Sequence, residues 1–491
     1  MIEKLAKQTA IYGISTIVGR FLSYLLTPYF TRIFGKATYG IVTDIYALIP
    51  FALVLLSMGF ESGYFRFATR AEEAGGDVRR AKNRLYATTA TITSLAALLF
   101  CALVLLNLHR VAAVMGQAYV EHPEYVAAVA MIILFDVMAC IPFSRLREQG
   151  RSGTFVALKL LNVVLNVALA FGFGFAGLYN TDFGVGWVFV ANLASSAIIW
   201  PLVLIKAGVV LPRIDTVLLS KILTYSMPLL LSGLAATGSE FLDRQMIKYI
   251  VPQESMAELG LYGAITKIAV VMVLFTQMYR LAAEPFFLAG YNKDDFIKLN
   301  AEAMKYFMLV SVVIFLGIAM FRDLFALIVG ADFREGTGIL PVILAANVAA
   351  GMWLNLSFWY KREEKTKYAL RVTLAGLAVT LTLGFFLIRF AGYRGAAWAR
   401  LASEATMVVI SLVLNRKYFP TPYDWRRIGE YVAVGAVMYC ASEAVLKVLP
   451  DPLVHTGVAA VLFAAFIVYA VRRENIDVKG LVRAVMHKFG I

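Results

Sequence analysis

The sequence predicts an all-α polytopic membrane protein with fourteen transmembrane helices, arranged as two pseudo-symmetric six-helix lobes and a final pair. Composition is the first observation behind this prediction, because the 491 residues are 60% hydrophobic and only 16% charged, with a mean hydropathy of +0.74. Soluble domains of this length are not so apolar. The second observation is that apolar runs of about 20 residues, long enough to cross a bilayer as helices, recur along the whole chain. The third is an internal repeat at a constant offset.

Fourteen apolar runs predict the spans. They lie at about 9–33, 39–66, 85–107, 123–143, 154–177, 184–206, 221–250, 259–288, 300–321, 338–359, 368–391, 395–414, 428–448 and 453–472. The first run contains Arg20 and lacks a small-residue cleavage site, so we expect it to be retained as a helix and not removed as a signal peptide.

Basic residues alternate between the connections as the positive-inside rule requires. Connections after even-numbered spans contain clusters of Lys and Arg, as in residues 79–84, 145–151 and 361–367, whereas connections after odd-numbered spans contain few. Because cytoplasmic loops carry the excess of Lys and Arg, both termini are predicted to be cytoplasmic. The same loops account for the formal net charge of +14, which in a soluble chain would suggest nucleic acid as a partner.

The connections give no indication of catalysis. They are short and contain no Gly-rich phosphate loop, no paired-carboxylate motif and no Ser/His/Asp set. The three cysteines lie in apolar runs without metal-ligand spacing. We therefore expect a protein that is not an enzyme and that has no cofactor and no metal site.

The C-terminal residues 473–491 form a separate element. Their apolar side chains recur on one helical face, and Lys and Arg flank that face. This pattern predicts an amphipathic tail that lies on the cytoplasmic leaflet, with a regulatory or partner-binding role as the alternative.

An internal repeat divides the chain. Residues 39–45 (YGIVTDI) recur as residues 262–268 (YGAITKI), and the same offset places Glu61 opposite Glu284 and Arg20 opposite Asp243. Each repeat contains six spans and begins in the cytoplasm, so the lobes are predicted at 1–214 and 215–420, followed by the final pair at 421–472. Transporters built from such repeats bind substrate between the halves and expose it to each side in turn.

Polar stripes on spans 1, 7 and 8 predict a hydrated interior. Arg20 on span 1 and Arg280 on span 8 each lie on a polar helical face, and span 7 carries Glu240, Asp243 and Arg244 on one face. A charge at the bilayer centre costs about 2.5–3.5 kcal/mol, so such residues usually face a bundle interior or a watery cavity. Because the arginine fork matches phosphate oxygens, Arg20 and Arg280 are the main candidates for binding phosphate.

Other charged residues are candidates for gates that close the outer and the inner side of the cavity. Asp44 and Lys267 occupy equivalent positions in the two halves and have opposite charges, so we expect them to pair at the outer side. On the inner side, Glu61 is predicted to act with Arg66 or Arg280.

The remaining carboxylates Glu240, Asp243 and Glu284 are candidates for gating or coupling. The four histidines lie in connections or in the tail, so any proton coupling would use carboxylates. Sodium and the membrane potential stay equally open as energy sources.

Of four further charged residues, two have a structural interpretation. Arg400 and Glu404 have i,i+4 spacing and are expected to neutralise each other on one helix. Lys159 fits a solvated helix end as well as a cavity, and Asp136 has no evident partner in the sequence.

The motif pattern resembles the polysaccharide-transporter branch of the multidrug/oligosaccharidyl-lipid/polysaccharide (MOP) superfamily, the Wzx-type flippases. The matching motifs are Tyr12-Gly13, Leu26-Thr27-Pro28, residues 34–40 (FGKATYG), Asp243-Arg244 with residues 259–262 (LGLY), and residues 328–333 (IVGADF) leading to 339–341 (ILP). The resemblance implies the MOP flippase fold around a cationic cavity. It also implies transport of an undecaprenyl-diphosphate-linked oligosaccharide, with Arg20, Arg244, Lys267 and Arg280 binding the diphosphate and acidic sugars. The number of cavity carboxylates departs from this pattern.

The expected function is a flippase of the bacterial inner membrane for O-antigen, capsule or exopolysaccharide synthesis. We expect a monomer that works beside glycosyltransferases and a polysaccharide polymerase. A lipid II flippase and a cation-coupled multidrug antiporter of the same superfamily are the alternatives.

Overall fold

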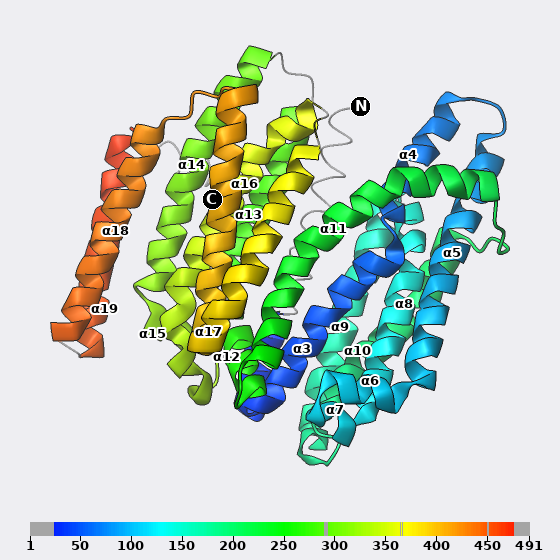
Figure 1. Ribbon diagram of the computed structural model, residues 1–491, viewed down its shortest axis with the longest axis horizontal. Coiled ribbons are helices and arrows are strands. Elements are labelled where there is room, and N and C mark those ends of the chain that lie inside the picture. Colours follow the sequence, from blue (N-terminus) through cyan, green and yellow to red (C-terminus); the bar gives the residue numbers. More distant parts are fainter. Residues whose placement is uncertain (1–23, 289–292, 364, 366, 449–450, 476–491) are drawn as a thin grey trace, which may run out of the picture. The chain divides into compact units, whose positions relative to one another are not determined.

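The computed structural model describes residues 24–288, 293–363, 365, 367–448 and 451–475. Within these ranges the regular structure is helical, without β-strands (Figure 1). The chain divides into two compact units, which are described one at a time. The first unit contains Met1–Lys267, Val329–Phe333 and Lys365–Ser403, and the second contains Ile268–Ile328, Arg334–Glu364 and Glu404–Ile491.

The first unit is built mainly from the N-terminal helices. These are α2 (Leu26–Ile33), α3 (Lys36–Ser57), α4 (Phe60–Glu73), α5 (Val78–Leu106), α6 (Leu108–Met115), α7 (Gln117–Glu121), α8 (Pro123–Glu148), α9 (Ser152–Phe175), η1 (Leu178–Asn180), α10 (Gly186–Ala207), α11 (Thr216–Ile250) and α12 (Ser255–Ile268). A buried cluster that includes Phe60, Tyr86, Ile141 and Ile222 joins α4, α5, α8 and α11. The short helices α6 and α7 lie in a connection for which the sequence predicted no structure.

The second unit contains the later helices. These are α13 (Val270–Leu288), α14 (Lys293–Ala319), α15 (Arg322–Ala326), η2 (Ala331–Ile339, which starts in the first unit), α16 (Leu340–Arg362), the end of α17 (Lys367–Tyr418), α18 (Trp425–Val448) and α19 (Pro452–Arg473). Leu316 of α14, Tyr431 of α18 and Phe466 of α19 are fully buried in one apolar cluster. The predicted final pair of helices therefore packs on α14.

The apolar helices make this chain a multi-pass membrane protein. Among the described residues, 11 helices are long and apolar enough to cross a membrane, or up to 12 if α12 and α13, which meet at a bend of 51°, form one span. Most of the predicted first span, as well as the tail, lies outside the described residues. The count of fourteen, the lobes and the cytoplasmic termini stay predictions.

Helix α17 contains two predicted spans, 368–391 and 395–414. Its 52 residues are interrupted at Gly392, whose φ of 55° and ψ of −135° are not helical. The Ser403 hydroxyl donates to the Gly376 carbonyl at 2.8 Å. In a straight helix, residues this far apart would be separated by about 40 Å at a rise of about 1.5 Å per residue. The chain therefore reverses at Gly392, and two antiparallel helices form where the sequence predicts two spans.

A break in the predicted second span separates α3 from α4. Met58 and Gly59 adopt left-handed φ angles of 52° and 67°. At Gly59 a Cβ atom would lie 3.0 Å from the Ser226 carbonyl oxygen of α11, so the position suits glycine in both backbone angle and space. The break redirects the chain while α3 and α4 both stay packed on α11.

Candidate functional site

The site is organised by a seam in the first unit, in which α3 and α4 run antiparallel to α11. Gly63 of α4 lies against Ser226 near the start of α11, and the Phe51 and Phe241 rings stack with centroids 4.7 Å apart. Glycine lets two helix backbones approach closely, which is the usual way in which membrane helices pack. Because the two elements run in opposite directions, each level of α3 faces a defined level of α11.

At one level of this seam, Asp44 of α3 is held by three partners. Its carboxylate lies 2.5 Å from the Lys248 ammonium and accepts hydrogen bonds from the Tyr119 hydroxyl and the Gln245 amide, each at 2.6 Å. The side chains of Asp44 and Lys248 are 2% and 5% exposed. A buried ion pair is tolerated when hydrogen bonds satisfy the remaining lone pairs, as they do here.

The predicted partner of Asp44 was Lys267, and in this structure that pair does not form. Lys248 replaces it because the antiparallel seam places the last turn of α11 beside Asp44. The Lys267 ammonium of α12 lies instead 4.8 Å from the Tyr24 ring centroid. The internal repeat matched positions along the sequence, but it carried no information about which helices face each other.

Glu240, Asp243 and Arg244 form a second cluster, about one turn closer to the N-terminus of α11 than Gln245 and Lys248. The Arg244 guanidinium donates to the Glu240 carbonyl at 2.7 Å and lies 3.6 Å from its carboxylate. Asp243 is buried, and the Tyr262 hydroxyl donates to it at 3.5 Å. The Glu240 side chain is 59% exposed.

Two cations from other helices complete this cluster. Arg400 of α17 acts electrostatically on both α11 carboxylates, and Lys267 acts on Glu240. The cluster therefore brings Arg244, Lys267 and Arg400 together with Glu240 and Asp243. Sequence reasoning did not find the place of Arg400 beside α11, because spacing along one helix does not show which helix packs opposite. The predicted pair of Arg400 with Glu404 on its own helix stays a prediction.

Glu61 on α4 has a partner that the sequence did not suggest. Its carboxylate accepts from the Ser144 hydroxyl at 3.2 Å and lies 3.9 Å from the Arg147 guanidinium, both on α8. The predicted pair with Arg66 does not form, because residues five apart on a helix point in different directions. Arg66 instead places its guanidinium 4.2 Å from the Tyr225 ring centroid.

Asp136, for which the sequence offered no partner, accepts a hydrogen bond from the Ser196 hydroxyl at 2.7 Å. Lys159 acts on it electrostatically and also lies 4.2 Å from the Phe143 ring centroid. These contacts fit a structural role for Asp136.

The remaining predicted site residues are not brought together by the described structure. Arg20 and the side chain of Glu284 lie outside the described residues. Arg280 is exposed on α13 in the second unit. Phosphate binding by Arg20 and Arg280 therefore stays a prediction.

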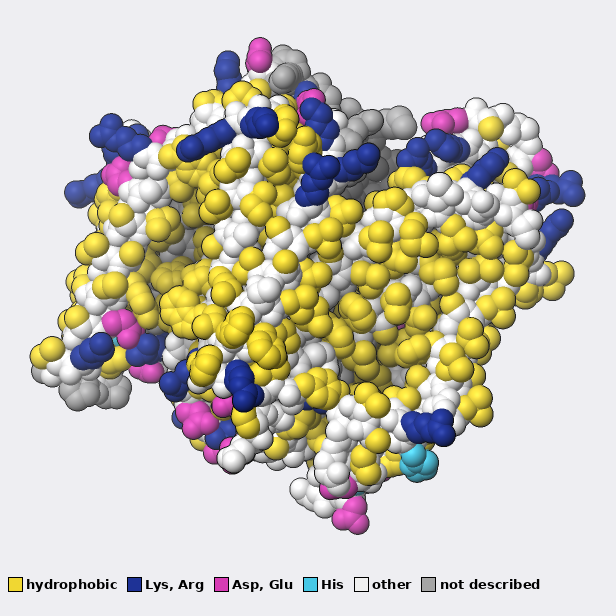
Figure 2. All heavy atoms as spheres, in the orientation of Figure 1, with side chains coloured by type: hydrophobic (Ala, Val, Ile, Leu, Met, Phe, Trp, Pro, Cys, Tyr) yellow, Lys and Arg dark blue, Asp and Glu magenta, His cyan; other side chains and the backbone are white. Residues whose placement is uncertain are grey.

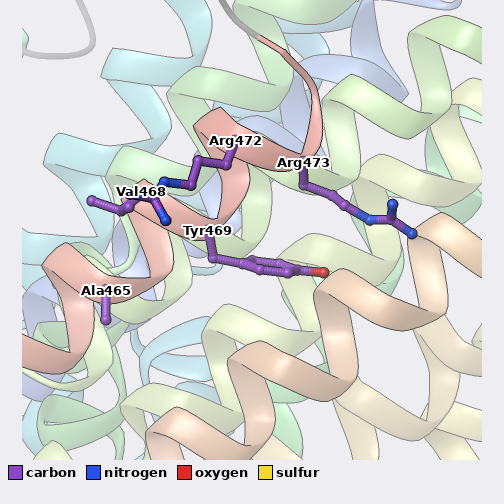
Figure 3. A pocket seen from close by; sticks show the side chains of 5 residues that line it. All are labelled: Ala465, Val468, Tyr469, Arg472 and Arg473. Atoms are coloured by element: carbon purple, nitrogen blue, oxygen red, sulfur yellow. The ribbon is translucent and has the colours of Figure 1, made fainter.

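A hollow in the second unit lies beside α19 (Figure 3). Tyr469 and Arg473 point toward α18, where both bond to the Glu430 carboxylate, at 2.7 and 2.9 Å. Arg472 points the other way (Figure 3). Since the polar groups of this hollow hold α19 on α18, we assign it a structural role.

Comparison with known families identifies a family for this chain. The model of the family described as "Polysaccharide biosynthesis protein" matches residues 5–288, more than half of the chain. No curated protein matches the sequence.

Comparison with solved structures gives matches to membrane transporters. A structure of the lipid II flippase MurJ in an inward closed conformation has a TM-score of 0.70 at 13% identity, covering 95% of this chain and 100% of its own. An inward-facing multidrug resistance MATE family transporter of the MOP superfamily has a TM-score of 0.67 at 15% identity, covering 84% and 96%. A MOP superfamily transporter from Pyrococcus furiosus, whose binding pocket is described as having reverse polarity, has a TM-score of 0.55 at 15% identity, covering 87% and 96%. At these identities the likeness establishes the fold alone.

Proposed function

Because the chain belongs to the polysaccharide biosynthesis protein family, we propose that it is a flippase for an undecaprenyl-diphosphate-linked oligosaccharide. It is a multi-pass membrane transporter of the MOP superfamily. In this proposal it works in the bacterial inner membrane as a monomer. There it moves its substrate from the cytoplasmic to the outer leaflet for surface polysaccharide synthesis. It works beside glycosyltransferases and a polysaccharide polymerase.

The observation that carries the proposal is the family match over residues 5–288. The cations Arg244, Lys267 and Arg400 act on the carboxylates of α11, and such cations can bind an anionic substrate. Arginine binds phosphate and carboxylate oxygens through two parallel hydrogen bonds, so this cluster suits a diphosphate and acidic sugars. Phosphate binding by Arg20 and Arg280 is also part of the proposal.

The Asp44 cluster is proposed as the gate on the outer side. A fully hydrogen-bonded ion pair between α3 and α11 would hold that side closed until the lobes rock. Glu240, whose side chain is 59% exposed, is the proposed coupling carboxylate, with proton, sodium and membrane potential as the candidate energy sources.

The test is a deletion strain complemented by the full chain. Wild type should restore surface polysaccharide and remove the accumulated lipid-linked unit, whereas Arg244→Gln with Arg400→Gln should not. Arg79→Gln, an exposed cation at the start of α5, is the matched control. Drug sensitivity of the deletion strain with intact polysaccharide would overturn the proposal and favour the antiporter.

A lipid II flippase is the second candidate, and the observation that favours it is the match over nearly the whole chain to MurJ. Proteoliposomes that contain either lipid II or a lipid-linked oligosaccharide separate the two candidates. Transport of lipid II alone would overturn the first proposal.

A further inference from the structure

A basic pocket lies between α4 and the first turns of α11, away from the charged cluster described above. We define it by Arg66 and Arg70 of α4 with Ser220, Lys221, Thr224 and Tyr225 of α11, and its volume is about 420 Å³. In Figure 2, Lys and Arg side chains gather over the ends of α4, α5 and α11 in the first unit, at the upper right.

Helical spacing and the seam together explain why these side chains converge. Arg66 and Arg70 are one turn apart on α4, and Lys221 and Tyr225 are one turn apart on α11, so each pair shares a helical face. Gly63 lies against Ser226, which brings the two helices together directly beside the pocket.

Within the part of the chain that the structure describes, the three cations of the pocket have no acidic partners. Arg66 contacts the Tyr225 ring, Arg70 lies 5.7 Å from the Phe67 ring centroid, and neither these two nor Lys221 has a carboxylate within ion-pair distance among the described residues. Neighbouring cations of the same unit differ. Lys82 bonds to Glu72 and Glu148, and Arg84 lies 3.3 Å from Asp215. The pocket therefore combines three positive charges, which no described carboxylate compensates, with the hydroxyl groups of Ser220 and Thr224.

Apolar surface continues from the pocket along α11. Ser220, Thr224, Met227 and Leu231 follow the i, i+4, i+7, i+11 pattern of one helical stripe. All four are exposed, and Met227 and Leu231 are 45% and 50% exposed. A ligand with its phosphate at Ser220 and Thr224 would thus have an apolar track, exposed among the described residues, for a hydrocarbon chain.

We infer that this basic pocket binds the diphosphate of the lipid-linked substrate at the membrane surface, before the substrate reaches the charged cluster on α11. The inference rests on the proposed function. Arginine forks and hydroxyl groups suit the phosphate oxygens, and the apolar stripe suits the polyprenyl chain. The shared chemistry is a phosphate group, which a phospholipid headgroup or soluble diphosphate also offers.

The experiment uses the purified full chain in nanodiscs of phosphatidylethanolamine, with binding followed by native mass spectrometry. One arm titrates undecaprenyl diphosphate, a second phosphatidylglycerol and a third inorganic pyrophosphate. The test variant is R66Q/R70Q/K221Q. The charge-matched control is R79Q/R80Q/R426Q, which removes three exposed cations elsewhere.

Wild type should bind undecaprenyl diphosphate at least about tenfold more tightly than either competitor, and the test variant should lose that advantage, a difference of about 1.4 kcal/mol. The control variant should bind like wild type. An equal loss in the control, or equal binding of phosphatidylglycerol or pyrophosphate by wild type, would overturn the inference.

A milder variant, R66K/R70K, tests the same inference if the triple variant fails to fold. R66K/R70K retains charge and loses the guanidinium forks, and it should bind undecaprenyl diphosphate more weakly than wild type. Transport assays separate the two proposals. If wild type moves the lipid-linked oligosaccharide and the test variant binds and moves it equally well, only the pocket inference fails. If wild type does not move it, the proposed function fails first.

Discussion

At the residue scale, the buried charges of the seam show how a membrane protein stabilises polar groups. Asp44 is nearly inaccessible, yet each carboxylate oxygen has a donor: Tyr119 and Lys248 at one, Gln245 at the other. Removing one partner of such a pair leaves an uncompensated charge, whereas removing both can be nearly neutral. The loss of stability on removing one partner therefore comes more from the charge left unpaired than from the lost attraction.

This argument predicts the outcome of a double-mutant cycle. Asp44→Asn and Lys248→Met should each lower the free energy of unfolding by about 3–5 kcal/mol, because each strands the other charge. The double variant should recover much of this loss. Thermal unfolding of the four proteins in detergent measures the coupling, and additive losses would contradict the prediction.

A second prediction concerns Glu474, which follows the last span. Burial raises its pKa, but bonds from Lys305 at 2.7 Å and from Tyr431, with the charge of Arg427, lower it further, so the net pKa lies below the usual 4.5. A folded-state pKa below the unfolded value stabilises the protein above the unfolded pKa, and that stabilisation is lost as pH falls through the folded pKa. Unfolding midpoints of wild type and Glu474→Gln should therefore differ at pH 7 and converge below about pH 4.5. A difference that is constant with pH would contradict this.

At the element scale, the sequence predicted helices better than contacts. Apolar length located α8, α11 and α18 to within a few residues, and Gly392 falls between two predicted spans. The break at Met58 and Gly59 was missed, because an apolar run continues across it. Lys248 and Arg147 were missed as partners, because the facing of two helices depends on packing and not on the spacing within either.

Close packing of α3 on α12 gives an element-scale prediction. A Cβ atom at Gly40 would lie 2.0 Å from the Met256 carbonyl oxygen, whereas a Cβ atom at Gly153 of α9 would meet nothing within 4 Å. Gly40→Val should therefore lower the free energy of unfolding by about 1–3 kcal/mol or more through overpacking. Gly153→Val is the matched control and should unfold close to wild type in the same thermal assay. Equal effects at both positions would show that helix propensity alone decides the result.

At the scale of the whole molecule, the compact first unit bears on how transport would proceed. It includes α11, α12 and the first part of α17, which the repeat assigned to the second lobe. If the lobes are 1–214 and 215–420, the seam between α3–α4 and α11 is a contact between lobes. Rocking of the lobes would then require this seam to part during each cycle.

A reversible cross-link between α4 and α11 tests whether the seam must part during transport. A Cβ atom at Gly63 would lie 2.6 Å from the Ser226 hydroxyl oxygen, so Gly63→Cys with Ser226→Cys brings two thiols within reach of a disulfide. In a background with Cys101, Cys140 and Cys440 replaced, the oxidised protein should lose transport in proteoliposomes, and reductant should restore it. Each single-cysteine variant should transport under both conditions. If the cross-linked protein transports as well as the reduced one, the seam stays closed throughout the cycle and the proposed lobe boundary at 214–215 is wrong.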